Sequence, residues 1–168
     1  MKLSQTLLPQ FDQEMATTRK LLERVPDDRI GWKPHEKSMS LGRLATHLAE
    51  LAGFGSRIME QDSLDVSSRV GSGYQPKVLE SSREMVELFD ENVRNSRAEI
   101  EKAEDQDLLK HWSLRNGEQV IFNLPRVAVL QTMLISHSIH HRGQLSVYLR
   151  LNDVPLPSIY GPTADEGI

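Results

Sequence analysis

Apolar residues recur at steps of three and four along four segments of the chain, a period that predicts amphipathic helices. These segments span residues 8–25, 41–58, 81–103 and 125–151. Pro26 stops the first pattern, and Ser40 stands where the second helix needs an N-cap. Ser81 and Glu84 have the spacing of a capping box, and Pro125 suits a first helical position.

The stretches between these segments predict little further regular structure. Residues 61–80 contain glycine and proline and lack helical periodicity, which indicates a long crossover. Residues 111–122 hold two short apolar runs around Asn116 and Gly117, which is typical of a hairpin. The tail, residues 155–168, is rich in turn formers and is expected to lie over the surface. The pattern predicts one all-α domain over residues 1–168, a four-helix bundle with a small hairpin before the last helix.

Composition narrows the functions that this domain can have. The 168 residues are 38% hydrophobic and 26% charged with a net charge of −4, which indicates a globular chain without a basic stripe for nucleic acid. The absence of cysteine excludes disulfides, thiolate ligands and a cysteine nucleophile. No segment approaches the roughly 20 apolar residues of a membrane span, and the N-terminal apolar run is too short for a signal peptide. We therefore expect a cytoplasmic protein that does not bind membranes.

Three histidines carry the strongest chemical signal. His137 and His141 are four residues apart, so they project from one face of the last helix. His47 lies on the apolar side of the second helix, whereas His140 falls about 100° from the middle of the apolar stripe. Packing the two helices together would bring three imidazoles into one place. Three imidazoles with an open fourth position are a common way to hold catalytic zinc.

A plainer explanation competes with a metal site. A single histidine on an apolar face is usually a hydrogen-bonded core residue. Three of them among leucines and valines would leave ring nitrogens without partners, at about 1–3 kcal/mol each, and a metal ion satisfies three at once. Ser138 stands where HExxH metalloproteases have their glutamate, so that base is missing.

Neighbouring residues leave further alternatives open. Glu50, three residues after His47, is a fourth ligand, a residue that supports the ligands or, the interpretation that we favour, part of a solvated helix face. His35 and His111 are expected at the surface. Gly143 costs helix stability, which predicts close approach of another segment.

These residues resemble the DinB/YfiT-like superfamily over nearly the whole chain. The matching pieces are LGRLATHLAEL, HSIHHRGQLSVYLRLNDV and VPLPSIYGPTADE. The resemblance implies an up-down-down-up four-helix bundle, a homodimer and a divalent ion, often nickel or zinc, with iron and manganese as further candidates. Carried over residue by residue, it implies that the metal ligands are His47, His137 and His141.

The resemblance also implies a class of activity. Characterised relatives include S-transferases and isomerases that use the small thiols bacillithiol or mycothiol, while many members have no known activity. We therefore expect a metal-dependent enzyme that transfers a low-molecular-weight thiol to a small electrophile. A metal-dependent hydrolase and a non-catalytic, metal-binding stress-response module are the alternatives. The loop after the second helix and Tyr160 are expected to line the mouth of the pocket.

Overall fold

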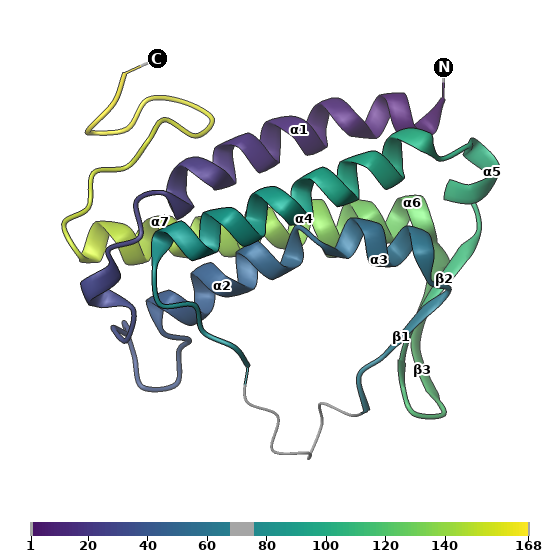
Figure 1. Cartoon of the computed structure of the whole chain (residues 1–168), viewed down its shortest axis with the longest axis horizontal. Helices are drawn as coiled ribbons and strands as arrows, with labels where there is room; N and C mark the ends of the chain where they lie inside the picture. The colour runs from purple at the N-terminus through teal and green to yellow at the C-terminus, as the bar shows by residue number, and fades with distance from the viewer. Residues whose placement is uncertain (1, 68–75, 168) are drawn as a thin grey trace.

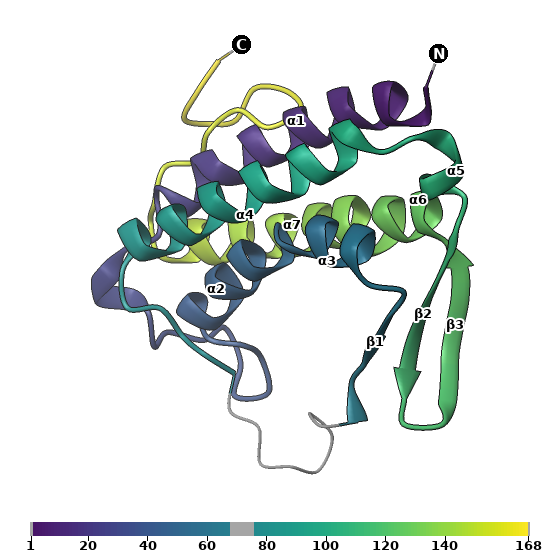
Figure 2. The ribbon, with the colours of Figure 1, turned by 45° about the vertical axis from the view of Figure 1, so that its right-hand side comes forward.

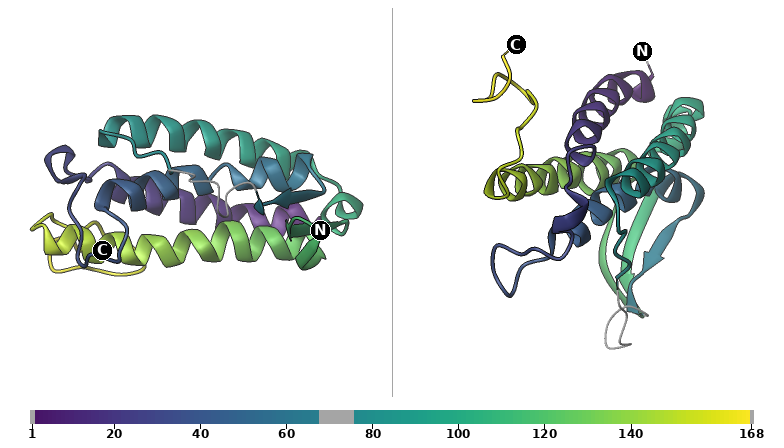
Figure 3. Two further views of the ribbon diagram at one scale, coloured as in Figure 1. Left: turned by 90° about the horizontal axis from the view of Figure 1, so that it is seen from below. Right: turned by 60° about the vertical axis from the view of Figure 1, so that its left-hand side comes forward.

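A computed structural model describes residues 2–67 and 76–167 and places four long helical segments side by side (Figures 1 and 3). The first two are α1, Leu3–Leu22, and the pair α2, Leu41–Leu51, with α3, Phe54–Glu60. The third is α4, Ser82–Lys102, and the fourth joins α6, Arg126–Val129, a π-helical stretch, Leu130–Ser136, and α7, His137–Leu151. Shorter elements are a 3-10 turn at Asp27–Arg29 and α5, Asp105–Leu108. Each helix in the described residues is too short or too polar to traverse a bilayer.

Two helices, α2 and α4, begin directly after the N-caps that the sequence predicts, whereas α1 begins and ends earlier than the predicted 8–25. The Ser40 hydroxyl accepts a hydrogen bond from the amide of Arg43, and the Ser81 hydroxyl accepts one from Glu84, both at 3.2 Å. Each bond satisfies one of the backbone donors that the first helical turn leaves open. At the other end of the chain, α7 gives way to Asp153, whose φ of 58° lies in the left-handed region that ends many helices.

Two of the predicted helices are less regular than their hydrophobic patterns indicate. The second is interrupted between α2 and α3, where Gly53 starts the new helix. The last helix contains the π-helical stretch immediately before His137. A π-helix has more residues per turn than an α-helix. A helical wheel drawn across residues 130–136 is therefore distorted. The relative direction of His137 and His141 is unaffected because both lie within α7.

The core lies where the four helical segments meet. Helix α1 packs against α4 and α7, α2 packs against the same two helices, and α3 packs against α4. Gly55 permits this last contact, because a Cβ there would lie 2.6 Å from the Cβ of Ser96. The Ser96 hydroxyl donates to the carbonyl of Ala52 at 2.5 Å and accepts from the amide of Ser56 at 3.1 Å. Gly143 is exposed, and a Cβ there would meet nothing within 4 Å, so the predicted close approach of another segment is wrong.

A three-stranded sheet projects from the end of the helices where α3 stops and α6 starts (Figure 2). Its strands, in the order β1-β2-β3, are β1, Ser63–Asp65; β2, His111–Asn116; and β3, Gln119–Pro125. The antiparallel pair β2–β3 confirms the predicted hairpin, with Gly117 at a φ of 59° in its turn. The parallel pairing of β1 with β2 was not predicted, and the expectation of an all-α chain is wrong here. Residues 68–75 of the predicted crossover lie outside the described residues.

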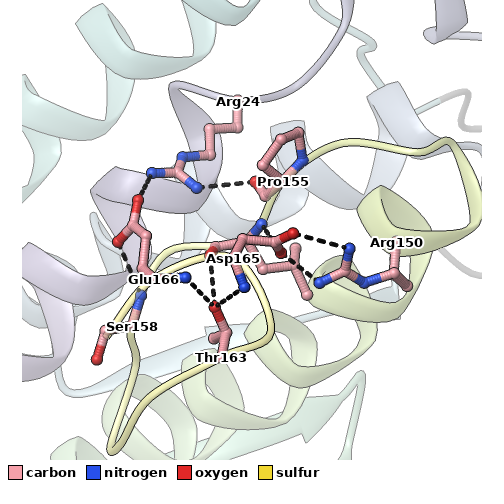
Figure 4. A network of polar contacts seen from close by, with 8 residues as sticks. Arg24, Arg150, Pro155, Ser158, Thr163, Asp165 and Glu166 are labelled. Carbon is pink, nitrogen blue, oxygen red and sulfur yellow. Dashed lines mark hydrogen bonds and ion pairs between the residues drawn. The ribbon is translucent and has the colours of Figure 1, made fainter. Parts of the chain in front are cut away.

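The C-terminal tail lies along α1 and α7 and is held there by polar contacts (Figure 4). Arg24 pairs with Glu166 and donates to the carbonyl of Pro155 at 2.8 Å. Arg150 pairs with Asp165, and the Thr163 hydroxyl accepts from the amide of Glu166 at 3.0 Å. The tail is therefore attached to the surface by two ion pairs and by hydrogen bonds, in agreement with the surface position predicted for it.

Candidate metal centre

Packing α2 against α7 brings the three predicted histidines together. His47 lies in the middle of α2, and His137 and His141 lie one turn apart at the start of α7. One nitrogen of each ring lies within 4.8 Å of the others, and the Nε2 atoms of His137 and His141 are 2.9 Å apart. The centroid of the His47 ring lies 4.7 Å from that of His141 and 5.4 Å from that of His137. The three rings form a single cluster that we call the histidine triad.

The protonation of His141 leaves a lone pair directed into the triad. Its Nδ1 lies 2.7 Å from Oε1 of Gln144. An amide oxygen accepts, so the proton sits on Nδ1, and Nε2 is the free acceptor that faces His137. Burial, with a smaller contribution from the nearby His47 and His137 rings, lowers the pKa of His141 to about 4 against the opposing effect of Gln144. The ring is therefore neutral near pH 7, the state in which imidazole binds metals.

His137 lacks partners that would explain it as an ordinary core residue. Its Nδ1 is buried, and its contact with the Met133 carbonyl lacks normal hydrogen-bond geometry. Burial lowers the pKa of His137 too, with His47 acting in the same direction. Two neutral rings with facing Nε2 atoms share at most one proton between them. A divalent ion fits this donor set, because it would accept lone pairs from all three rings.

Glu50 does not lie on a solvated helix face, so the interpretation that we favoured for it is wrong. Its Oε2 accepts from Nη2 of Arg43 at 2.9 Å and lies 3.8 Å from Nδ1 of His47. Burial raises the pKa of Glu50, but its contacts with His47 and Arg43 outweigh this effect and lower it. An ionised carboxylate beside Nδ1 favours a proton there and leaves Nε2 of His47 for the triad. Glu50 is not itself part of the triad.

A cavity of about 220 Å³ adjoins the triad. Its walls come from α2, α3 and the start of α7: Arg43, His47, Glu50, Leu51, Phe54, Arg57 and His137. Hollows of about 540 and 680 Å³ open elsewhere, but no histidine lines either of them. We place the site at the smaller cavity because it reaches two of the three rings. The sequence pattern did not indicate its arginines, because neither the pairing of Arg43 with Glu50 nor the position of α3 at this cavity follows from apolar periodicity.

Tyr160 does not line this cavity, contrary to the prediction. Its hydroxyl donates to Oε2 of Glu14 at 2.8 Å and accepts from Nη2 of Arg142 at 2.5 Å. Arg142 and Glu14 form an ion pair of 2.6 Å with both side chains buried. This network fastens α7 to α1 immediately beside His141. Residues far apart in the sequence form it, which explains why no local motif indicated it.

The remaining histidines lie where the sequence predicts. His140 is exposed and outside the triad, although its ring centroid is 4.9 Å from that of His141. His35 and His111 are exposed as well. The structure thus brings together the three histidines predicted as ligands and leaves the other three apart. That the triad binds an ion stays a prediction.

Comparisons with known proteins show which proteins the chain is similar to. Two Bacillus subtilis (strain 168) proteins are each 25% identical to the chain: uncharacterized protein YrdA, over 95% of this chain and 89% of its own length, and uncharacterized protein YjoA, over 88% and 89%. The crystal structure of the DinB-like protein YjoA from Bacillus subtilis matches with a TM-score of 0.68 and 21% identity, covering 92% of this chain and 97% of that one. A DinB-like protein from Bacillus cereus ATCC 10987 matches with a TM-score of 0.67 and 20% identity, covering 91% and 95%. These two structures share the fold. The model of the DinB family matches residues 1–167, and the chain therefore belongs to the DinB family.

Proposed function

We propose that this protein is a divalent-metal-dependent enzyme that transfers a low-molecular-weight thiol to a small electrophile. The observation that carries the proposal is the meeting of three imidazoles beside a cavity. Three neutral ligands leave the full charge of the ion in place and a coordination position open toward the cavity. We further infer that the four helical segments form an up-down-down-up bundle, as the resemblance implies. We also infer that the protein is located in the cytoplasm.

The residues of the site have two roles: three would hold the metal ion, and two orient the rings of these ligands. His47, His137 and His141 would hold the ion, Gln144 fixes the ring of His141, and Glu50 keeps the Nδ1 proton on His47. When bound, the ion supplies Lewis acidity, which makes a thiol or water more acidic near neutral pH. We infer nickel or zinc because imidazole nitrogen suits both, with iron and manganese as further candidates.

The reaction needs a thiol from outside the chain, because the chain has no cysteine. In the transfer, a bond forms between the thiol sulfur and a carbon of the electrophile, and the bond from that carbon to its leaving group breaks. The sulfur gives up its proton, and the leaving group departs with the electron pair. The cavity of about 220 Å³ offers room for the reacting ends of the thiol and the electrophile beside the triad.

A two-panel assay tests this function. The metal-loaded protein is incubated with bacillithiol, mycothiol, glutathione or cysteine together with alkyl and aryl halides, and separately with esters and amides. We expect thiol consumption that exceeds the uncatalysed rate, is lost in His137→Ala and is kept in His140→Ala. Turnover in the ester and amide panel alone would replace this proposal with a metal-dependent hydrolase. No turnover above the uncatalysed rate in either panel would favour a non-catalytic metal-binding module.

A further inference from the structure

The cavity beside the histidine triad is lined by two arginines but by only one carboxylate. Arg43, Glu50 and Arg57 are its charged lining residues. Arg43 is neutralised by Glu50 at 2.9 Å and also donates to the carbonyl of Lys77 at 3.0 Å. Within residues 2–67 and 76–167, no carboxylate pairs with Arg57. The three charged side chains that line the cavity, two arginines and one glutamate, therefore sum to a net charge of about +1.

The position of Arg57 is set by its helix and its neighbour. Arg57 and Phe54 lie three residues apart on α3, so they share one face of that helix. The guanidinium carbon lies 5.8 Å from the centroid of the Phe54 ring, within the range of a cation–π contact. Phe54 lines the cavity as well, and the close packing of Gly55 on Ser96 fixes α3 against α4. The Arg57 guanidinium is thus held at the cavity while its donors stay accessible to a ligand.

A guanidinium in this setting selects for a particular chemical group. Its planar fork of N–H donors matches the two oxygens of a carboxylate, and such charge-assisted pairs are stronger than neutral hydrogen bonds. A divalent ion at the triad would add positive charge a short distance away and would reinforce the preference. A neutral ligand would leave Arg57 solvated and would gain neither contact.

We propose that Arg57 binds a carboxylate group of the small molecule that enters this cavity, so that the site selects anionic reactants. This inference rests on the proposed function, since it names the substrate class of the same site. The carboxylate belongs either to the thiol or to the electrophile. The shared chemistry is a carboxylate placed within reach of Arg57 while the reacting atom faces the triad.

Calorimetric titration with matched ligand pairs tests the proposal without relying on turnover. The thiol pair is 3-mercaptopropionate and its neutral amide, and the acceptor pair is 4-chloro-3-nitrobenzoate and its methyl ester. Each is titrated into wild type, Arg57→Gln and Arg83→Gln. Arg83 is the control because its substitution changes the charge equally at a side chain that is 86% exposed and does not line the cavity. Elemental analysis of each sample reports the metal content.

We expect wild type to bind the carboxylate member of one pair about tenfold more tightly than its neutral partner. Arg57→Gln should lose this ratio while keeping its metal, and Arg83→Gln should keep both. The pair that shows the ratio identifies whether the thiol or the electrophile carries the carboxylate. An unchanged ratio in Arg57→Gln, an equal loss in both variants, or no preference in wild type would overturn the proposal. Metal-free wild type would contradict the proposed function instead, and the acceptor pair would still decide the role of Arg57.

Discussion

At the scale of single residues, the low pKa of His141 makes the stability of the metal-free protein depend on pH. The pKa of His141 is about 4 in the folded chain against an ordinary value of 6.5, so the unfolded chain binds more protons between these limits. Stability from this residue is therefore present above about pH 6.5 and is lost as pH falls toward 4, by up to ~3 kcal/mol.

Urea unfolding of chelator-treated protein at several pH values between 7.5 and 4.5 measures this dependence. Other groups titrate in the same range, so the comparison between variants is the informative quantity. His141→Gln should flatten the fall in unfolding free energy relative to wild type, whereas His140→Gln, at an exposed neighbouring ring, should not. Parallel curves for wild type and His141→Gln would show that the ring of His141 is not held in its neutral form by burial.

At the scale of elements, two glycines on different helices provide a matched test of how α3 is held. Gly55→Ala would place a Cβ 2.6 Å from the Cβ of Ser96, so we expect overpacking to cost about 1–3 kcal/mol of unfolding free energy. Gly143→Ala meets open space and should gain up to about 1 kcal/mol, because alanine favours the helix. Chemical denaturation of both variants is the measurement, and equal effects would contradict the close contact between α3 and α4.

Local signals in the sequence account for most of the helices but not for their irregularities. The hydroxyls of Ser40 and Ser81 cap helices as predicted, because capping depends on residues within one turn. The break before α3 and the π-helical stretch leave the apolar pattern almost intact, so periodicity cannot reveal them. Strand β1 is only three residues long, and its partner β2 lies far along the chain.

In the candidate site, too, some features could be predicted from the sequence and others could not. The inward direction of His137 and His141 follows from their spacing on one helix, and that of His47 follows from the apolar stripe around it. The contacts of Glu50 with Arg43, the placement of Arg57 over Phe54 and the docking of Tyr160 on Arg142 depend on side-chain packing. Spacing fixes the face of a helix on which a residue lies, but tertiary packing decides its partner.

At the scale of the whole molecule, we propose a homodimer, the state that the resemblance of the sequence led us to expect. Leu109, Ile121 and Val147 are exposed, which leaves apolar surface that association would remove from water. Light scattering at micromolar concentration should give twice the 19.1 kDa mass of the chain. A single species with the mass of one chain under these conditions would contradict the prediction.

The histidine triad is predicted to bind one divalent ion per chain. Elemental analysis of protein purified without a nickel column tests it most directly, with wild type, His137→Ala and His140→Ala prepared in parallel. We predict close to one ion per chain in wild type and His140→Ala and a large loss in His137→Ala, because Nε2 of His137 lies 2.9 Å from its counterpart in His141 whereas His140 is exposed outside the triad. Equal metal content in wild type and His137→Ala, or loss in His140→Ala alone, would show that the triad does not hold the ion.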